Sequence, residues 1–317
     1  MRACFHAGLA LLFASVFCAA EAAPAQAPGY FRYALGGFTV TALYDGSLNI
    51  PLSAYQGAGQ ERMHGLAAEQ FLDQPAGVPT SVNAYLIDTG SHRILVDTGT
   101  AACFGPDPDL GHVPENLRAA GYAPEDIDIV LITHLHGDHF CGLKRGDGKR
   151  AYPNAAVWVA QAEAAYWLDE KIAAAKPENQ QGAFEQAREV MGLYRAAGRL
   201  HLFTPGETIV PGLGIVPAPG HTPGHTAFLF ESQGRSLLVF GDIVHCYAVQ
   251  FPLPAVWVVS DIDPKQAVAT REALFARLAR DGTAIAGAHL PFPGIGHIRR
   301  EGEGYAYVPV EYGPLAK

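Results

Sequence analysis

Short apolar runs separated by turn residues make up much of the chain and predict a protein with many short β-strands. Residues 83–88 and 93–97 are two such runs on either side of Thr89-Gly90-Ser91-His92, which is the signal of a β-hairpin. The other runs that predict strands are 38–44, 127–133, 214–218, 236–241 and 283–288, with 305–312 as a closing strand or tail. The pattern favours a fold built on β-sheets.

Four segments between these runs predict helices instead. They are 114–120, 161–175, 183–197 and 265–280, the second and third being divided by the polar stretch 176–182. Asp263 and Pro264 supply an N-cap and a first-turn proline for the last of them, and Gly282 lies just past its end. Residues 50–79 contain scattered glycine and proline and predict a long loop.

The N-terminus has the pattern of an export signal. Arg2 supplies a positive charge, residues 9–20 form a short apolar run, and residues 20–23 offer small side chains for cleavage. The run is too short to anchor the chain in a bilayer, which takes about 20 apolar residues. A periplasmic or secreted protein without a stable membrane anchor is therefore expected. The predicted organisation is a secretion signal over 1–23, a flexible lead-in over 24–29 and one folded domain over 30–317.

Composition and charge indicate which kinds of molecule the protein can bind. Hydrophobic residues make up 49% of the chain and charged residues 17%, which suits a globular protein with a sizeable core. The formal net charge of −9 opposes binding to nucleic acid or to anionic lipid, since both select basic surfaces. A small neutral substrate fits this charge better.

Cysteine usage does not indicate a disulfide scaffold. Removal of the leader would leave Cys103, Cys141 and Cys246, and three cysteines allow at most one bridge. We expect no bridge and interpret each of the three as a small packed residue.

The segment Thr133-His134-Leu135-His136-Gly137-Asp138-His139 places four candidate metal ligands within six positions. His134 and His136 are two residues apart, so on an extended backbone both side chains project to the same side. Gly137 allows a sharp turn that would bring Asp138 and His139 towards the same point. Imidazole and carboxylate are good ligands for Zn²⁺. The segment therefore predicts a metal site at the end of a buried strand.

Three further candidates follow predicted strands in the same way. His221 comes after 214–218, Asp242 directly after 236–241, and His289 directly after 283–288. Seven ligands exceed the four that one tetrahedral zinc ion takes, but two ions about 3.5–4 Å apart would use them all. Zinc is the default for such ligands, and manganese, cobalt or iron are alternatives.

Taken together, these residues resemble the metal-binding motif of the metallo-β-lactamase superfamily. Over nearly the whole mature chain, the sequence further resembles the branch formed by methyl parathion hydrolase and the lactonases and arylesterases similar to it. The segments that carry this likeness are Pro28-Gly29-Tyr30, Val96-Asp97-Thr98-Gly99, residues 117–122, 221–225, 248–251 and 288–298, and Val308-Pro309-Val310. The resemblance implies an α+β fold, a four-layer αββα sandwich with the metals at one edge, and a homodimer.

The resemblance also implies a role for each ligand. His134, His136 and His221 would hold one ion, Asp138, His139 and His289 the other, and Asp242 would bridge them. His225 would lie outside the ligand set, and Asp97 would orient a ligand imidazole from behind. A hydroxide bridging the two ions would attack a carbonyl carbon or a phosphorus centre, while one ion stabilises the developing charge on oxygen. Asp138 or Asp242 would relay the proton, and the sequence leaves that choice open.

Residues around the metals bear on the substrate. Phe104, Trp167 and Phe184 match an aromatic-lined pocket of the family, with ordinary core packing as the alternative. The chain departs from the methyl parathion hydrolase pattern at Gly137, where a proline is expected, and at His245, where an apolar pocket residue is expected. His245 would donate a hydrogen bond to substrate, unless it is a solvated loop residue. These departures favour lactones or aryl esters as substrates, with phosphotriester hydrolysis as a side reaction.

Other functions remain as alternatives. A phosphotriesterase of the methyl parathion hydrolase kind and an exported β-lactamase use similar ligands, although Asp242 differs from the cysteine that some β-lactamases carry there. A glyoxalase II-like thioesterase shares the His134–His139 pattern but acts on cytosolic thioesters. A redox di-iron protein would carry an acidic residue in place of His136. Outside enzymes, a metal-binding protein of the cell envelope would not need Asp242 between two ions.

Overall fold

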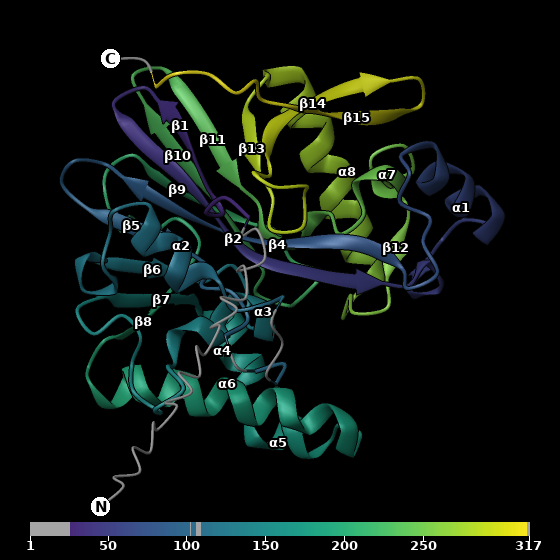
Figure 1. Cartoon of the computed structure of the whole chain (residues 1–317). Coiled ribbons are helices and arrows are strands. Elements are labelled where there is room, and N and C mark those ends of the chain that lie inside the picture. The colour runs from purple at the N-terminus through teal and green to yellow at the C-terminus, as the bar shows by residue number, and fades with distance from the viewer. Residues whose placement is uncertain (1–25, 102, 106–108, 316–317) are drawn as a thin grey trace, which may run out of the picture.

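Two β-sheets pack face to face, and helices cover the outer face of each (Figure 1). This computed structural model describes residues 26–101, 103–105 and 109–315. The predicted secretion signal and the first residues of the predicted lead-in lie outside these ranges. Among the described residues, no helix combines the length and the apolar character that crossing a bilayer requires.

The first sheet has seven strands within the described ranges, and its middle carries part of the candidate site. Antiparallel pairs join the first four strands in the order β1-β2-β4-β5, and parallel pairs add β6, β7 and β8. The strands are β1 (Tyr30–Leu35), β2 (Phe38–Ile50), β4 (Val78–Asp88), β5 (Arg93–Val96), β6 (Ile129–Leu131), β7 (Ala156–Ala160) and β8 (Leu200–Phe203).

The second sheet has six strands among the described residues, in the order β15-β14-β13-β11-β10-β9, and only the β11–β13 pair is parallel. A two-stranded ribbon of β3 (Tyr55–Gln56) and β12 (Trp257–Val258) lies apart from both sheets. The strands of the second sheet are β9 (Leu213–Pro217), β10 (Thr226–Ser232), β11 (Arg235–Val239), β13 (Ala284–Ala286), β14 (Ile295–Glu301) and β15 (Gly304–Pro309).

Strands at the middle of each sheet are apolar on both faces because each face contacts a different core. On β5, Leu95 packs towards the helices, while Ile94 and Val96 pack towards the second sheet. On β11, Leu238 packs towards α8 (Pro264–Asp281), while Leu237 faces the first sheet. Since successive side chains of a strand point to opposite faces, near-continuous apolar runs are what a strand between two cores requires.

The helices divide between the two outer faces. Against the first sheet pack α2 (Val113–Ala119), α3 (Gly137–Phe140), α4 (Gln161–Trp167), α5 (Glu170–Ala174) and α6 (Glu178–Ala196). On the second sheet, α8 supplies Leu274, Phe275 and Leu278. A small fourth core joins α1 (Gln60–Glu69) to α7 (Tyr247–Gln250) at one end of the molecule (Figure 1).

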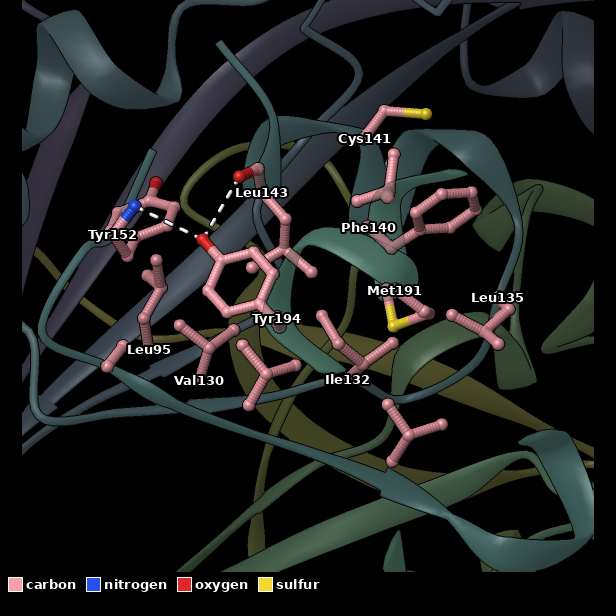
Figure 2. Packing of buried hydrophobic residues seen from close by; sticks show 14 of the residues in the cluster. Leu95, Val130, Ile132, Leu135, Phe140, Cys141, Leu143, Tyr152, Met191 and Tyr194 are labelled. Carbon is pink, nitrogen blue, oxygen red and sulfur yellow. Dashed lines mark hydrogen bonds between the residues drawn. The ribbon is translucent and has the colours of Figure 1, made fainter. Parts of the chain in front are cut away.

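The core beneath the first sheet includes one polar anchor, the hydroxyl of Tyr194 on α6. It donates to the carbonyl of Leu143 at 3.0 Å and accepts from the backbone N–H of Tyr152 at 3.2 Å (Figure 2). Leu143 lies three residues after α3. The hydroxyl therefore ties the long helix α6 to the segment that follows the His134–His139 run.

The predicted α+β sandwich is confirmed, but several local predictions are wrong. Residues 50–79 contain α1 instead of one long loop; only Met63 and Ala67 of that helix are buried, so its apolar pattern is weak. The predicted helix over 161–175 is two helices, because Asp169 accepts hydrogen bonds from the N–H groups of Lys171 and Ile172 and starts a new one. The strands β1, β3, β7, β8, β10, β12 and β14 were not predicted.

Candidate metal centre

Each of the predicted ligands lies in a loop or a short helix that follows a strand, at one edge of the sandwich. The run from His134 begins three residues after β6 in the first sheet. His221, Asp242 and His289 follow β9, β11 and β13 in the second sheet. Both sheets therefore contribute ligands to one place.

The seven predicted ligands form two clusters of donor atoms. In each cluster all the donor atoms lie within 4.8 Å of one another. The first cluster is His134, His136, His221 and Asp242; the second is Asp138, His139 and His289. A third grouping of Asp242, His245 and His289 overlaps both. The grouping into two sets matches the one that the family resemblance implies.

Ligand atoms without a hydrogen-bond partner indicate that these residues fit a metal ion. His134 Nε2, His139 Nε2 and Asp242 Oδ1 are buried and make no hydrogen bond with any described residue. His139 Nε2 lies only 3.1 Å from Asp242 Oδ1, so distance is not what prevents the bond. Ligands that point at a shared third atom have this short but misaligned geometry. Leaving such atoms unsatisfied is costly, and a divalent ion would satisfy them.

At Asp242 and His136, charge and burial favour the protonation states that bind metals. Burial alone would raise the pKa of Asp242, but His139 and the neighbouring imidazoles outweigh it and hold that pKa well below its usual range. Burial lowers the pKa of His136 to about 3, with His221 adding to the effect. An ionised carboxylate and a neutral imidazole are the ligating forms of these groups.

Two carboxylates behind the ligands orient their imidazoles. Asp97 Oδ2 lies 2.9 Å from Nδ1 of His139, where the family resemblance places an orienting carboxylate. Asp261 Oδ1 lies 2.7 Å from Nδ1 of His221. The carbonyl of Ser81 does the same for His289 at 2.8 Å. Each contact holds the Nδ1 proton, which leaves Nε2 free to face the centre.

Asp261 was not predicted, because it contacts a residue 40 positions away and no motif surrounds it. Asp97, by contrast, has an unusual backbone conformation. Its φ is +59°, in the left-handed region that non-glycine residues rarely adopt. Thr133 fixes it there by donating its N–H and its hydroxyl to the carboxylate, each at 2.8 Å.

His225 lies outside both clusters, beneath the ligand Asp242. Its Nε2 accepts the backbone N–H of Asp242 at 3.0 Å. Gly241, with a φ of +55°, makes room for this bond, since a Cβ there would lie 2.7 Å from His225 Nε2. His225 thus supports the loop that carries Asp242.

The residues predicted to line a substrate pocket differ in position. Trp167 packs edge-on against the ring of His136, with 5.4 Å between ring centroids. Phe184 lies behind Trp167 and is 2% exposed, so in this structure it is a core residue and not a pocket wall. Phe104 is 51% exposed and lies over Gly137. His245 is buried, stacks on His289 and has its Nε2 3.1 Å from Asp242 Oδ2, so it is not a solvated loop residue.

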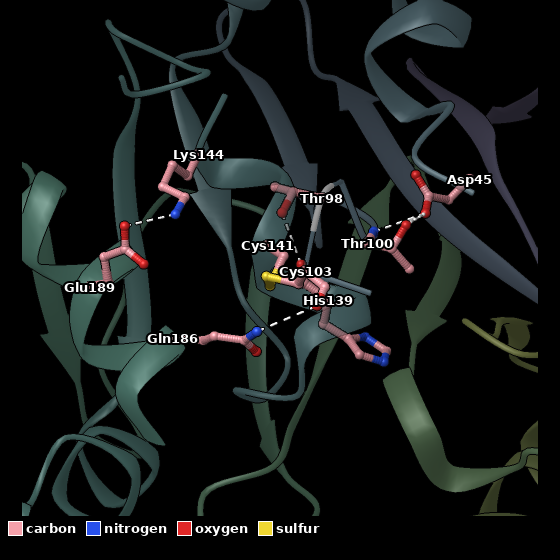
Figure 3. The surroundings of a disulfide bond; sticks show 9 residues. All are labelled: Asp45, Thr98, Thr100, Cys103, His139, Cys141, Lys144, Gln186 and Glu189. Atoms are coloured by element: carbon pink, nitrogen blue, oxygen red, sulfur yellow. Dashed lines mark hydrogen bonds and ion pairs between the residues drawn. A yellow bond between two sulfur atoms is a disulfide. The ribbon is translucent and has the colours of Figure 1, made fainter. Parts of the chain in front are cut away.

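The absence of a disulfide was predicted and is wrong. Cys103 and Cys141 form one, and it ties the loop after Asp97 to the residue two positions beyond His139 (Figure 3). Thr98 donates its hydroxyl to the carbonyl of His139 at 3.0 Å in the same region. The spacing of the cysteines gave no sign of this pairing, because α3 and that loop meet only in the folded chain. Cys246 is free and buried, as expected for a packed residue.

The proposed turn at Gly137 also needs correction. Gly137 begins α3, and it is not among the residues with positive φ. A Cβ at this position would lie 3.3 Å from the ring of Phe104 and 3.5 Å from the sulfur of Cys141. The glycine therefore serves close packing of the loop on α3, and the helix itself brings Asp138 and His139 round to the centre.

Comparison with known proteins agrees with this geometry. The sequence model of the family described as the metallo-beta-lactamase superfamily matches residues 77–289. A solved hydrolase of the beta-lactamase superfamily, AbOPH, has a TM-score of 0.87 and 40% identity, covering 92% of this chain and 100% of its own. The dizinc quorum-quenching lactonase AidC has a TM-score of 0.82 over 90% of this chain and 99% of its own, and at 24% identity the likeness shows the fold.

Among curated proteins, an N-acyl homoserine lactonase of Bacillus cereus is 26% identical over 174 residues. That match spans 49% of this chain and 60% of the relative. The chain thus covers less than two thirds of the length of this lactonase.

Proposed function

The chain belongs to the metallo-beta-lactamase superfamily, and we propose that it is a metal-dependent hydrolase with two divalent ions that opens lactones or cleaves aryl esters. The observation that carries this proposal is the pair of ligand clusters, with Asp242 of the first cluster also 3.1 Å from His139 and 3.1 Å from His289 of the second. The likeness to AbOPH, a hydrolase at 40% identity over nearly the whole chain, supports the reaction class. The lactonase activity named for the Bacillus cereus relative supports the substrate class.

His134, His136 and His221 would hold one ion, Asp138, His139 and His289 the other, and Asp242 would contact both. Zinc is the metal that these donors favour, and AidC is a dizinc enzyme of the same fold. The ions would supply a water acidified to near-neutral pKa and a positive charge at the substrate oxygen.

The protein's own part is to fix the imidazoles and to move a proton. Asp97, Asp261 and the Ser81 carbonyl hold the Nδ1 protons of His139, His221 and His289, so that each Nε2 stays directed at the centre.

Asp138 is the better placed of the two candidate proton carriers. Its side chain is 13% exposed against 3% for Asp242, so Asp138 reaches solvent while Asp242 is enclosed by imidazoles. Burial alone would raise the pKa of Asp138, but His139 and His289 outweigh it and lower that pKa, which keeps the carboxylate ionised at neutral pH.

The walls of the centre favour a neutral substrate with an aromatic or acyl part. Phe104 exposes half of its surface beside α3, and Trp167 covers His136. His245, buried against His289, places a polar ring where an apolar wall would suit a phosphotriester. Phosphotriester hydrolysis of the methyl parathion hydrolase kind is therefore proposed as a side reaction. The net charge of −9 also favours a neutral substrate.

Export to the periplasm or the medium, after removal of residues 1–23, and assembly as a homodimer belong to the same proposal. Both rest on the sequence pattern and on the family resemblance.

The test is a substrate panel assayed with the zinc-loaded mature protein. It contains dihydrocoumarin, an acyl-homoserine lactone, a p-nitrophenyl ester, methyl paraoxon and a β-lactam. We expect the highest kcat/KM on a lactone or an aryl ester. A lead by methyl paraoxon or by the β-lactam would refute the proposed substrate class. Binding of two metal ions without turnover of any of the five would refute the hydrolase itself and favour a metal-binding protein.

A further inference from the structure

Glu163 is a carboxylate buried beside the metal centre but outside both donor clusters. It is the third residue of α4, and its relative exposure is 0%. Burying a carboxylate is costly unless hydrogen bonds compensate for the lost water. The fold therefore has to provide strong partners for this side chain.

Three donors satisfy Glu163, each at 2.8 Å. The backbone N–H of Leu135 donates to Oε1. The hydroxyl of Thr222 and the backbone N–H of Gly224 donate to Oε2. Hydrogen bonds to an ionised acceptor are shorter and about twice as strong as neutral ones, so these three form a firm clamp.

The donors belong to two loops from different sheets. Leu135 lies between His134 and His136, in the loop after β6. Thr222 follows His221 directly, in the loop after β9 of the second sheet. Both loops lie outside the strand ladders. One backbone hydrogen bond, from the N–H of Thr226 to the carbonyl of Thr133 at 2.9 Å, joins the two segments beside them. The Glu163 side chain adds a second bridge, directly between the residues that flank the three histidines of the first cluster.

Backbone packing brings the second loop onto α4 at the same place. A Cβ on Gly224 would lie 2.1 Å from the backbone nitrogen of Glu163 and 2.6 Å from its Cα. Only glycine fits so close an approach. The distance from α4 to the His221 loop is therefore set by direct backbone contact, and the carboxylate then reaches across to Leu135.

We propose that Glu163 is a positioning residue that sets the spacing between His221 and the His134–His136 pair, and so tunes the metal affinity of that cluster alone. The second cluster, Asp138, His139 and His289, makes none of these contacts in the described structure. The inference rests on the proposed function in that the site holds two ions.

Four variants separate this role from general stability. Glu163→Gln keeps the size but turns one acceptor oxygen into a donor, which opposes an N–H or the hydroxyl. Thr222→Val removes one donor and keeps the shape, and Thr222→Ser restores the hydroxyl as the matched control. His136→Ala identifies which of the two zinc equivalents belongs to the first cluster.

Zinc affinity is measured for both equivalents by competition with a chromophoric chelator, alongside the absorption spectrum of the cobalt form and the melting temperature. We expect Glu163→Gln to weaken the equivalent that His136→Ala eliminates by about 10–100-fold, as loss of a group behind metal ligands typically does. The affinity for the other zinc equivalent should stay at the wild-type value. Thr222→Val weakens the same equivalent, Thr222→Ser does not, and the cobalt spectrum changes in step.

A lower melting temperature with both zinc equivalents at wild-type affinity would overturn the inference, as would equal weakening of the two. If Glu163→Gln does not fold, the two Thr222 variants decide. A Thr222→Ser variant that binds zinc at the first cluster as weakly as Thr222→Val would refute the role of the Glu163 hydrogen bonds. No substrate enters this titration. A wild-type protein that binds two zinc ions without any esterase or lactonase turnover therefore refutes the proposed function and leaves the role of Glu163 to be judged by the affinities.

Discussion

Asp242 Oδ2 lies 3.1 Å from Nε2 of His289, and the same oxygen lies 3.2 Å from Nε2 of His221. One carboxylate therefore contacts one histidine of each donor cluster. Asp242 thus joins the two ligand clusters, and both sheets contribute residues to them. It is the arrangement expected of a residue that shares two metal ions.

The contact between Asp261 and His221 predicts a selective effect on metal binding. Asp261→Asn should weaken zinc at the first cluster by about 10–100-fold, because His221 loses the acceptor that fixes its tautomer and ring orientation. Asp263→Asn is the control: Asp263 caps α8, asparagine caps a helix as well, and the side chain does not contact a ligand. Chelator competition measures both variants, and equal affinities would contradict the orienting role.

Metal binding should release protons at neutral pH. Burial opposes charge on His139 and His221, yet the surrounding carboxylates outweigh it, raising the pKa of His139 well above its usual range and that of His221 to about 9. With pKa values above 7, both imidazoles carry a second proton, on Nε2, in the metal-free protein, and zinc must displace that proton. Affinity should therefore rise with pH up to about 9. Calorimetry in buffers of different ionisation enthalpy measures the release, and a buffer-independent enthalpy would contradict it.

The cysteines make a prediction about chemical labelling. In the mature chain, alkylation in denaturant without reductant should find one free thiol, Cys246, and all three cysteines should react after reduction. Burial raises the pKa of Cys246 to about 11, so labelling of the native protein should be slow at pH 7 and faster as the pH rises. Mass spectrometry reads out the labels. Three reactive thiols without reductant would show that Cys103 and Cys141 are not bonded.

Tyr194 offers a test of the core that joins α6 to the segment after α3. Tyr194→Phe removes the hydroxyl that joins Leu143 and Tyr152. The Leu143 carbonyl keeps the N–H of Ala151, while the buried N–H of Tyr152 loses this partner. The free energy of unfolding should fall by about 1–3 kcal/mol. Urea unfolding measures this change against Tyr312→Phe, whose side chain is 89% exposed and should be silent. Equal midpoints for the two variants would remove the anchoring role.

Local patterns in the sequence were enough to place most of the metal centre. His134, Asp242 and His289 each stand at the end of an apolar run, and a strand end is where the fold gathers them. The sandwich was predicted from the family resemblance, and runs such as 93–97, which are apolar on both faces, agree with a strand between two cores.

What the sequence could not show are contacts between distant segments. Asp261 and Glu163 act on loops far along the chain, and nothing in their neighbours marks them. The Cys103–Cys141 bond depends on how one loop lies over α3. Phe184 looked like a pocket residue, but whether an aromatic faces a cavity or a core is decided by the packing of α6 and α4.

The most direct test of the two-ion hydrolase is a zinc titration of the metal-free protein with turnover of dihydrocoumarin followed at each addition, alongside Asp242→Ala. If two zinc ions share Asp242, activity should appear mainly with the second equivalent of zinc. The Asp242→Ala variant should stay inactive at every ratio of zinc to protein. Full activity with the first equivalent, or an Asp242→Ala variant as active as the wild type, would contradict it.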